Sequence, residues 1–124
     1  MERDKLKDLR LEIHSARIEG TNEIEFFQNS VLRQVIKFQH DPILLLVSSH
    51  PHYKELTTNK GPRTAFQLHV QQFIVKQKDL KNQLIGCIIG HFTSEEFVEY
   101  LKQQNEYNKR IIQMIVQRVM DTLY

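Results

Sequence analysis

The chain has 124 residues, of which 40% are hydrophobic and 26% charged, and its formal net charge is +2. These values are typical of a folded globular protein and exclude an intrinsically disordered one. Lysine and arginine are interspersed with aspartate and glutamate, so the sequence lacks the basic stripe with which nucleic-acid-binding proteins neutralise phosphates. We therefore expect a single domain over residues 1–124 that binds no nucleic acid.

The cysteine and hydropathy patterns indicate the compartment. Cys87 is the only cysteine, so an internal disulfide cannot form. Residues 1–5 lack the apolar segment of a signal peptide, and the longest apolar stretch, Leu84–Gly90, is about a third of the roughly 20 residues that a membrane span needs. We expect a soluble, cytoplasmic protein without membrane contact. The apolar surroundings of Cys87 predict an inert thiol.

Apolar residues recur every three or four positions along most of the chain, which predicts helices. The first predicted helix covers about residues 4–18, with its apolar side formed by Leu6, Leu9, Ile13 and Ala16. Gly20 suits the left-handed position after a helix end, and Thr21 is a candidate N-cap for the next helix. That second helix covers 22 to about 39, and its apolar stripe comprises Ile24, Phe27, Val31, Val35 and Phe38.

Asp41 followed by Pro42 predicts a helix restart, because the carboxylate can cap and proline suits the first helical position. We expect helix to continue as far as Ser49, with a kink at Pro42. The run Ile43–Val47 could form a buried strand, but a lone strand would have no partner for its backbone, so we interpret it as helix. The polar residues 52–61 predict a loop that is partly helical near residues 53–56.

Two further helices follow this loop. The first begins at Pro62, and its predicted buried stripe comprises Phe66, Val70, Phe73, Ile74 and Gln77. The second begins with Asp79 as the cap and ends at Gly90, with its inward face formed by Leu80, Leu84, Cys87 and Ile88. Gly86 and Gly90 stand four residues apart, a spacing that predicts the close approach of another helix.

Residues 93–96 (Thr-Ser-Glu-Glu) form a capping box, in which the threonine and the second glutamate satisfy each other's backbone donors. The helical pattern then continues to the C-terminus over roughly 30 residues, or about 45 Å, and is weakest at 105–108. Its inward positions comprise Phe97, Leu101, Tyr107, Ile111, Met114, Ile115, Val119 and Leu123. The apolar surface at 111–116 is wider than one stripe, as in a helix that is central in a bundle or lies at a subunit interface. We expect both, and hence a homodimer.

The predicted fold class is therefore all-α: a single-domain helical bundle of about 4–6 helices with a long C-terminal helix.

Polar side chains on the second predicted helix form the first candidate ligand-binding group. Asn29, Arg33 and Lys37 are one helical turn apart and share a face. If this face lines a cleft, it could hold an anionic or carbonyl group, with Arg33 donating paired hydrogen bonds. Otherwise the three side chains form a solvated surface.

His91 is the fourth candidate, because it lies between two predicted helices. In one interpretation it is a neutral base or ligand, with its pKa lowered by the positive end of the last helix. In the other, it closes the preceding helix by donating to free carbonyls.

Other polar groups favour no particular chemistry. His50 and His52 could share a metal only with further ligands such as His40 or His69, and the sequence does not bring these together. Arg110 and Arg118 could pair with acidic residues or lie on the surface. The sequence contains no phosphate loop, dinucleotide fingerprint, nucleophile elbow or zinc-peptidase motif. We expect no metal, no cofactor and no catalytic residue.

Three stretches carry a resemblance: residues 25–39 (EFFQNSVLRQVIKFQ), residues 88–96 (IIGHFTSEE) and residues 108–111 (NKRI). They resemble a family of short, uncharacterised all-helical proteins from Bacteroidetes-type bacteria. Some members carry the name glyoxalase, but glyoxalase I enzymes are β-rich metal enzymes and the glyoxalase II type has a dense His/Asp motif. This sequence has neither pattern. The resemblance therefore implies a helical bacterial protein without an assigned reaction.

The sequence supports three functional hypotheses. We favour a non-catalytic cytoplasmic helical module that self-associates and binds a protein partner or a small ligand. The alternative is a small metal-independent enzyme or ligand-binding protein with a polar pocket around Arg33 and His91. A third hypothesis is a regulator that lacks a DNA-binding motif of its own.

Overall fold

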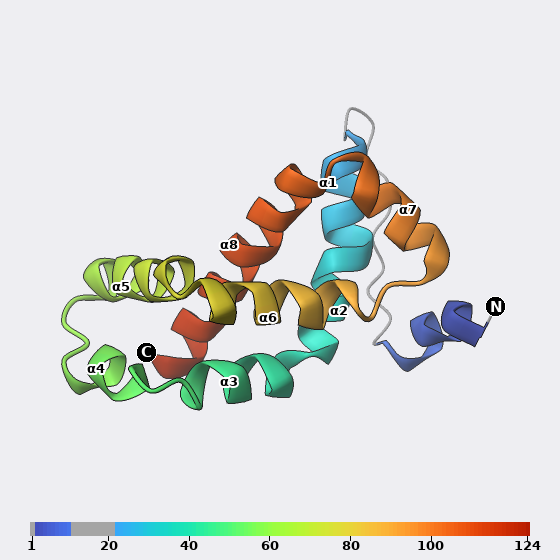
Figure 1. Ribbon diagram of the computed structural model, residues 1–124. Coiled ribbons are helices and arrows are strands. Elements are labelled where there is room, and N and C mark those ends of the chain that lie inside the picture. Colours follow the sequence, from blue (N-terminus) through green and yellow to red (C-terminus); the bar gives the residue numbers. More distant parts are fainter. Residues whose placement is uncertain (1, 11–21) are drawn as a thin grey trace.

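The computed structural model describes residues 2–10 and 22–124, and this part of the chain contains helices and no strand (Figure 1). The predicted all-α class is confirmed. After a 3₁₀-helix and a helix interrupted by a π-helical turn, six more α-helices follow in the described residues. This exceeds the predicted 4–6 helices, in part because the predicted C-terminal helix is divided at Gln103. The elements are η1 Glu2–Leu9, α1 Glu23–Phe27, η2 Gln28–Leu32, α2 Arg33–Phe38, α3 His40–Ser48, α4 Tyr53–Thr58, α5 Arg63–Lys76, α6 Lys78–Ile89, α7 Ser94–Lys102 and α8 Gln104–Leu123.

The N-cap of α1 is Asn22, whose side-chain oxygen accepts a hydrogen bond from the Glu25 N–H at 2.8 Å. The prediction that Thr21 caps this helix is therefore wrong in its residue. A side-chain oxygen one position later reaches the third N–H of the helix, as N-caps do. The predicted first helix coincides with η1 at its start, and its remainder from residue 11 lies outside the described residues.

The segments α1, η2 and α2 form one continuous helix that widens at η2. The Arg33 N–H donates to the Gln28 carbonyl five residues earlier, which defines a π turn. The extra residue in this turn rotates the buried face, so that Leu32 and Ile36 join the predicted Val31 and Val35 in the core. Phe38, which we predicted to be buried, is 42% exposed for the same reason.

The break between α2 and α3 lies at Gln39, whose φ of −90° and ψ of 19° depart from helical geometry. Asp41 and Pro42 lie inside the first turn of α3, so the predicted cap and kink are displaced by two to three residues. Ile43 and Val47 are fully buried on this helix, which confirms that the apolar run is helical. The helical turn predicted in the following loop is α4.

The helices α5 and α6 bury most of the residues that their stripes predicted, including Phe66, Val70 and Ile74 on α5 and Leu80, Leu84 and Ile88 on α6. Phe73, Gln77 and Cys87 are only half-buried. Asp79 is the second residue of α6 rather than its cap. The close helix contact predicted at Gly86 is wrong, because Gly86 is exposed and a Cβ built there meets nothing within 4 Å.

The capping box at the start of α7 is confirmed. The Thr93 hydroxyl accepts from the Glu96 N–H at 3.2 Å, and the Glu96 carboxylate accepts from the Thr93 N–H at 2.9 Å. The predicted 30-residue helix is in fact α7 and α8, separated at Gln103 with φ −139° and ψ 54°. The Tyr100 hydroxyl donates to the Asn108 side chain across this corner. The corner also leaves Leu101, predicted to be buried, 56% exposed.

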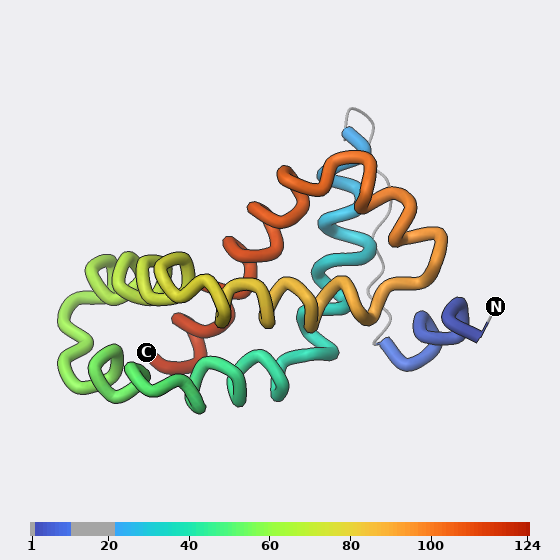
Figure 2. The backbone as a smooth tube through the Cα atoms, in the orientation of Figure 1, coloured from blue at the N-terminus to red at the C-terminus, as the bar shows by residue number. Residues whose placement is uncertain are grey.

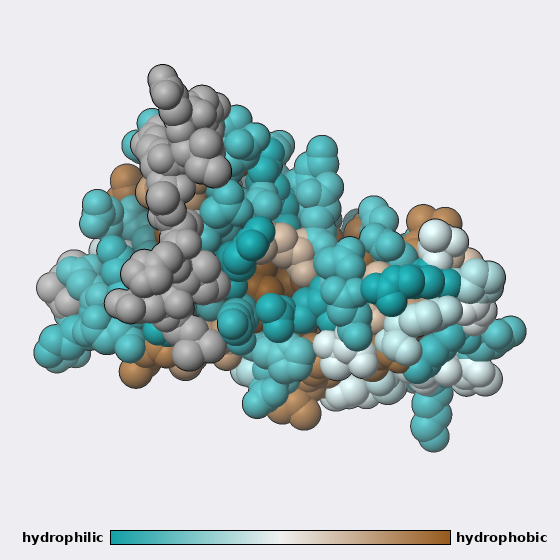
Figure 3. Space-filling model, turned by 180° about the vertical axis from the view of Figure 1, so that it is seen from behind, coloured by the Kyte–Doolittle hydropathy of each residue, from teal (hydrophilic) through white to brown (hydrophobic). Residues whose placement is uncertain are grey.

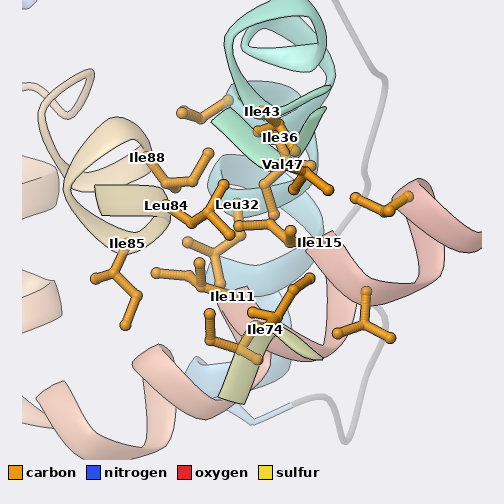
Figure 4. Close-up of a cluster of buried hydrophobic side chains, with 14 of the residues drawn as sticks. Leu32, Ile36, Ile43, Val47, Ile74, Leu84, Ile85, Ile88, Ile111 and Ile115 are labelled. Atoms are coloured by element: carbon orange, nitrogen blue, oxygen red, sulfur yellow. The ribbon is translucent and has the colours of Figure 1, made fainter. Parts of the chain in front are cut away.

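The helix α8 lies at the centre of the molecule and packs against α2, α3, α5, α6 and α7. The tube in Figure 2 shows α8 crossing α6, while α3 and α6 lie side by side. Side chains from these helices point toward one another in one apolar cluster (Figure 4), in which the labelled residues include Leu32, Ile43, Leu84, Ile111 and Ile115. Four of the five apolar residues at 111–116 are buried within this one chain, which explains the width of the apolar surface.

The surface is mostly hydrophilic, with apolar residues in separate patches on the face shown in Figure 3. Among the described residues, no helix combines the length and the apolar character that crossing a membrane requires.

Candidate functional site

A groove of about 480 Å³ lies between the continuous helix formed by α1, η2 and α2 and the helix α8. Its apolar lining consists of Ile36 and Met114, and its polar lining comprises Gln28, Arg33, Gln117, Arg118, Asp121 and Thr122. Near the middle of the face in Figure 3, a recess with an apolar floor is surrounded by hydrophilic side chains. The groove thus combines an apolar floor with a polar rim, as small-molecule sites do.

Two guanidinium groups of the groove have no carboxylate partner among the described residues. Arg33 Nη2 lies 3.4 Å from the Asn29 Oδ1, a long hydrogen bond to a neutral amide. Arg118 Nη1 lies 3.1 Å from the His40 Nδ1, which accepts when that ring nitrogen carries no proton. Each guanidinium has five N–H donors, so both keep donors available for a ligand.

The carboxylate of the groove is already engaged. Asp121 Oδ1 accepts from Arg63 Nη2 at 2.8 Å and from Gln117 Nε2 at 2.9 Å. The charge of Asp121 is therefore largely balanced by Arg63, which does not line the groove. In the described part of the chain, no acidic side chain contacts Arg33 or Arg118, so their positive charges are not neutralised by an ion pair there.

The structure brings together only some of the predicted ligand-binding residues. Asn29 contacts Arg33, and Arg33 lines the groove. Lys37 is exposed and does not line it, nor does His91. The pairings of Arg110 and Arg118 are also resolved: Arg110 donates to Glu106 at 3.1 Å and to Gln28 at 2.7 Å, whereas Arg118 contacts a histidine.

His91 belongs to a second group of polar residues, at the corner between α6 and α7. The residue is 7% exposed, and its ring stacks on Phe38 with ring centroids 4.7 Å apart. Beside it, Arg10 donates to both carboxylate oxygens of Glu96, at 2.7 and 2.8 Å, and to the His91 carbonyl at 2.5 Å. All three residues are buried, so this ion pair is shielded from solvent.

The environment of the corner shifts two pKa values. Burial raises the pKa of Glu96, but the hydrogen bonds from Arg10 and from the Thr93 backbone outweigh burial, so the pKa lies below its ordinary value. Burial lowers the pKa of His91, and the charge of Arg10 lowers it further, whereas Glu96 and a hydrogen bond to the Leu6 backbone act in the opposite direction. The predicted lowering for His91 is confirmed in direction, but its causes are burial and Arg10.

The role predicted for His91, donation to the free carbonyls of the preceding helix, is filled by Arg3. Arg3 Nη2 donates to the Gly90 carbonyl at 2.9 Å, and Arg3 Nε donates to the Phe92 carbonyl at 3.0 Å. The sequence patterns did not indicate Arg3 or Arg10 as candidate functional residues. They lie more than 80 residues from their partners, and no local pattern links positions so far apart.

The rings of His50 and His52 lie close together, with centroids 5.5 Å apart. The His50 ring accepts from the His52 N–H at 3.2 Å, and the His52 ring lies 3.4 Å from Glu55. Glu55, His52 and His69 line a shallow recess of about 370 Å³, but within the described ranges no three His, Cys, Asp or Glu residues are grouped to hold a metal ion. Burial raises the pKa of the Cys87 thiol, which disfavours the reactive thiolate.

Comparisons with known proteins gave no match of the chain to a family model, to a curated protein or to a solved structure. The resemblance to the helical bacterial family therefore stays a prediction.

Proposed function

We propose that the protein is a non-catalytic binding module that holds an organic anion in the groove between α2 and α8. The observation that carries this proposal is the pair of guanidinium groups beside the apolar floor, Arg33 and Arg118, for which residues 2–10 and 22–124 supply no carboxylate partner. Hydrogen bonds between guanidinium and carboxylate or phosphate are among the strongest that proteins make, because both partners are charged.

The shape of the groove narrows the chemistry of the ligand. Its volume of about 480 Å³ lies within the range of roughly 300–1,000 Å³ that is usual for small-molecule sites. Ile36 and Met114 offer apolar contact to the body of a ligand, while the two arginines can donate hydrogen bonds to its anionic end. We infer a ligand with one carboxylate or phosphate and an apolar part.

A binding role fits this groove better than catalysis. The carboxylate at its rim, Asp121, is engaged by Arg63 and Gln117, which leaves it poorly placed to act as a general base. An enzyme with a pocket around Arg33 and His91 would need both side chains in one cavity, and His91 packs against Phe38 instead. We therefore keep the enzyme as the weaker hypothesis.

Two further expectations belong to this proposal. A cytoplasmic location rests on the single cysteine of the chain. Self-association loses its main support, because the broad apolar surface at 111–116 is explained by packing within one chain. It remains a prediction that light scattering can test.

The proposal is tested by calorimetric titration of the protein with hexanoate and with phenyl phosphate. Saturable binding is expected to weaken about tenfold or more when Arg33→Gln or Arg118→Gln removes a charged donor. Lys109→Gln removes an exposed charge of α8 that does not line the groove, so this matched control should bind like the unmodified protein. Arg33→Lys should be intermediate, since an ammonium keeps the charge without the fork.

Equal weakening by the Lys109 variant would show that binding reflects overall charge, and it would contradict a built site. So would the absence of saturable binding of either probe up to about 1 mM, a concentration that corresponds to only about 4 kcal/mol of binding free energy.

A further inference from the structure

The corner between α6 and α7 concentrates hydrogen-bond acceptors. The Gly90 carbonyl belongs to the C-cap of α6, and the carbonyls of His91 and Phe92 lie in the turn between α6 and α7. Backbone oxygens outside regular helix need hydrogen-bond donors from elsewhere. The Glu96 carboxylate lies beside them, held in place by the Thr93 N–H of the capping box. These acceptors suit a ligand with several N–H donors and positive charge.

In this structure, side chains of the chain's own residues 2–10 donate to these acceptors. Arg10 forms paired hydrogen bonds with Glu96 and a third with the His91 carbonyl. Arg3, seven residues earlier, donates to the Gly90 and Phe92 carbonyls. The paired geometry with Glu96 is specific for arginine, because only a guanidinium presents two parallel N–H groups to one carboxylate.

Apolar contact contributes little to the attachment of this segment. None of the residues of η1 is buried, and Leu9 is 60% exposed. Arg10 is the buried anchor that follows η1. Two arginine side chains, one of them buried, therefore anchor the segment to the corner, as in the recognition of a short peptide.

The fit is also incomplete. Arg10 Nε and His91 Nε2 are buried and have no hydrogen-bond partner in the described part of the chain. A buried polar atom without a partner costs free energy, so the bound segment forfeits part of what its charged hydrogen bonds contribute. A segment that binds in this way can be displaced by a competitor.

We propose that the α6–α7 corner is a peptide-binding site for arginine-bearing protein segments, which the chain's own residues 2–10 occupy and screen. The ligand class is a short segment with two arginines seven residues apart, one for the Glu96 carboxylate and one for the carbonyls of Gly90 and Phe92. This site is separate from the α2–α8 groove and does not depend on the ligand proposed there.

The test uses the full-length Arg3→Ala/Arg10→Ala variant, in which the resident arginines no longer occupy the corner. A fluorescent synthetic peptide of residues 2–10 should bind this variant saturably. It should bind the unmodified protein at least about tenfold more weakly, because the tethered segment competes at high effective concentration. A peptide with Arg10→Lys should also bind the variant about tenfold more weakly, since lysine cannot form the paired bonds.

Two results would overturn the proposal: a folded double variant that binds no peptide, and equal binding of a peptide in which lysine replaces both arginines. The second would indicate attraction of charge alone.

The double variant can lose its fold, so the unmodified protein provides a second measurement. In spectra of the ¹⁵N-labelled protein, a large excess of unlabelled peptide should shift the amide signals of Gly90 and Phe92 as it displaces the resident segment. Unchanged signals together with an unfolded double variant would equally overturn the proposal.

Discussion

At the scale of single residues, His91 is the side chain whose surroundings most clearly disfavour a positive charge. It is 7% exposed, stacks on Phe38 and lies beside the guanidinium of Arg10. Burial removes the water that would solvate the imidazolium, and Arg10 repels it. The neutral ring is therefore the form that the folded protein accommodates.

We predict that acidification destabilises the protein through this residue. The folded-state pKa of His91 lies below its ordinary value of 6.5, so below about pH 6.5 the unfolded chain takes up a proton that the folded chain does not. Stability must then fall with falling pH, and it falls again below the ordinary value of 4.5 for Glu96, whose folded-state pKa is also lowered. Urea unfolding at a series of pH values measures both losses.

The variant His91→Gln cannot take up this proton, so it should lose less stability than the unmodified protein between about pH 7 and pH 5.5. The matched control is His69→Gln on the exposed face of α5. This variant should lose as much stability over the same pH range as the unmodified protein. An identical pH dependence in the His91 variant and the unmodified protein would contradict the assignment.

We expect Arg33 to contribute to ligand binding but little to the stability of the fold. Its side chain is exposed, and it donates a long hydrogen bond of 3.4 Å to the Asn29 side chain. We predict that Arg33→Ala changes the free energy of unfolding by under about 0.5 kcal/mol, because surface substitutions away from buried networks have small effects. A loss of several kcal/mol in chemical denaturation would show that Arg33 carries structure, and the groove would need another explanation.

At the level of secondary structure, features that depend on neighbouring residues could be predicted from the sequence. The exact positions of the helix breaks, which depend on packing, could not. The capping box at Thr93 depends on neighbouring residues and is confirmed. The apolar stripe of α5 is confirmed at Phe66, Val70 and Ile74.

The break at Gln39 lies two to three residues before the restart predicted at Asp41 and Pro42, and the break at Gln103 precedes the weak stretch at 105–108. Local patterns therefore indicated both regions but not the positions of the breaks, which contain neither glycine nor proline. The π turn at η2 rotates the buried face without a sequence signal, and it exposes Phe38.

The helix α6 offers a direct test of local structure at Gly86. This glycine is exposed in the helix interior, and a Cβ there would meet nothing within 4 Å. We predict that Gly86→Ala stabilises the protein by about 0.5–1 kcal/mol, because alanine has the higher helix propensity and restricts the unfolded chain. Urea denaturation measures the change.

Gly90→Ala is the opposite control, since its Cβ would lie 2.9 Å from the Gly86 carbonyl oxygen and should destabilise the helix end. If Gly86→Ala were instead destabilising in a manner that depends on protein concentration, another chain would have to pack on this face.

At the scale of the whole molecule, the central position of α8 explains both the core and the groove. One side of this helix buries Ile111, Ile115 and Val119, while another carries Met114 and Arg118 toward the groove. The sequence indicated the apolar width of the helix and the candidate Arg33. It could not indicate that Arg118 lies opposite Arg33, or that Arg10 pairs with Glu96, because the helix arrangement alone brings these residues together.

We predict that Ile115→Ala costs about 2–5 kcal/mol of unfolding free energy, because Ile115 is fully buried in the shared core and its truncation leaves a cavity. Leu101→Ala, on the exposed side of α7, should cost within about 0.5 kcal/mol. Chemical denaturation of both variants checks the difference. Equal costs would contradict a core centred on α8.

Nuclear magnetic resonance of the arginine side chains can show whether Arg33 and Arg118 together hold an anion. During titration with hexanoate, the Nε–H signals of Arg33 and Arg118 should shift saturably with one common dissociation constant, together with the backbone amides of Ile36 and Met114. The Arg63 signal should change little, since Asp121 already engages that side chain. Small, non-saturating shifts spread over all cationic side chains would contradict the claim.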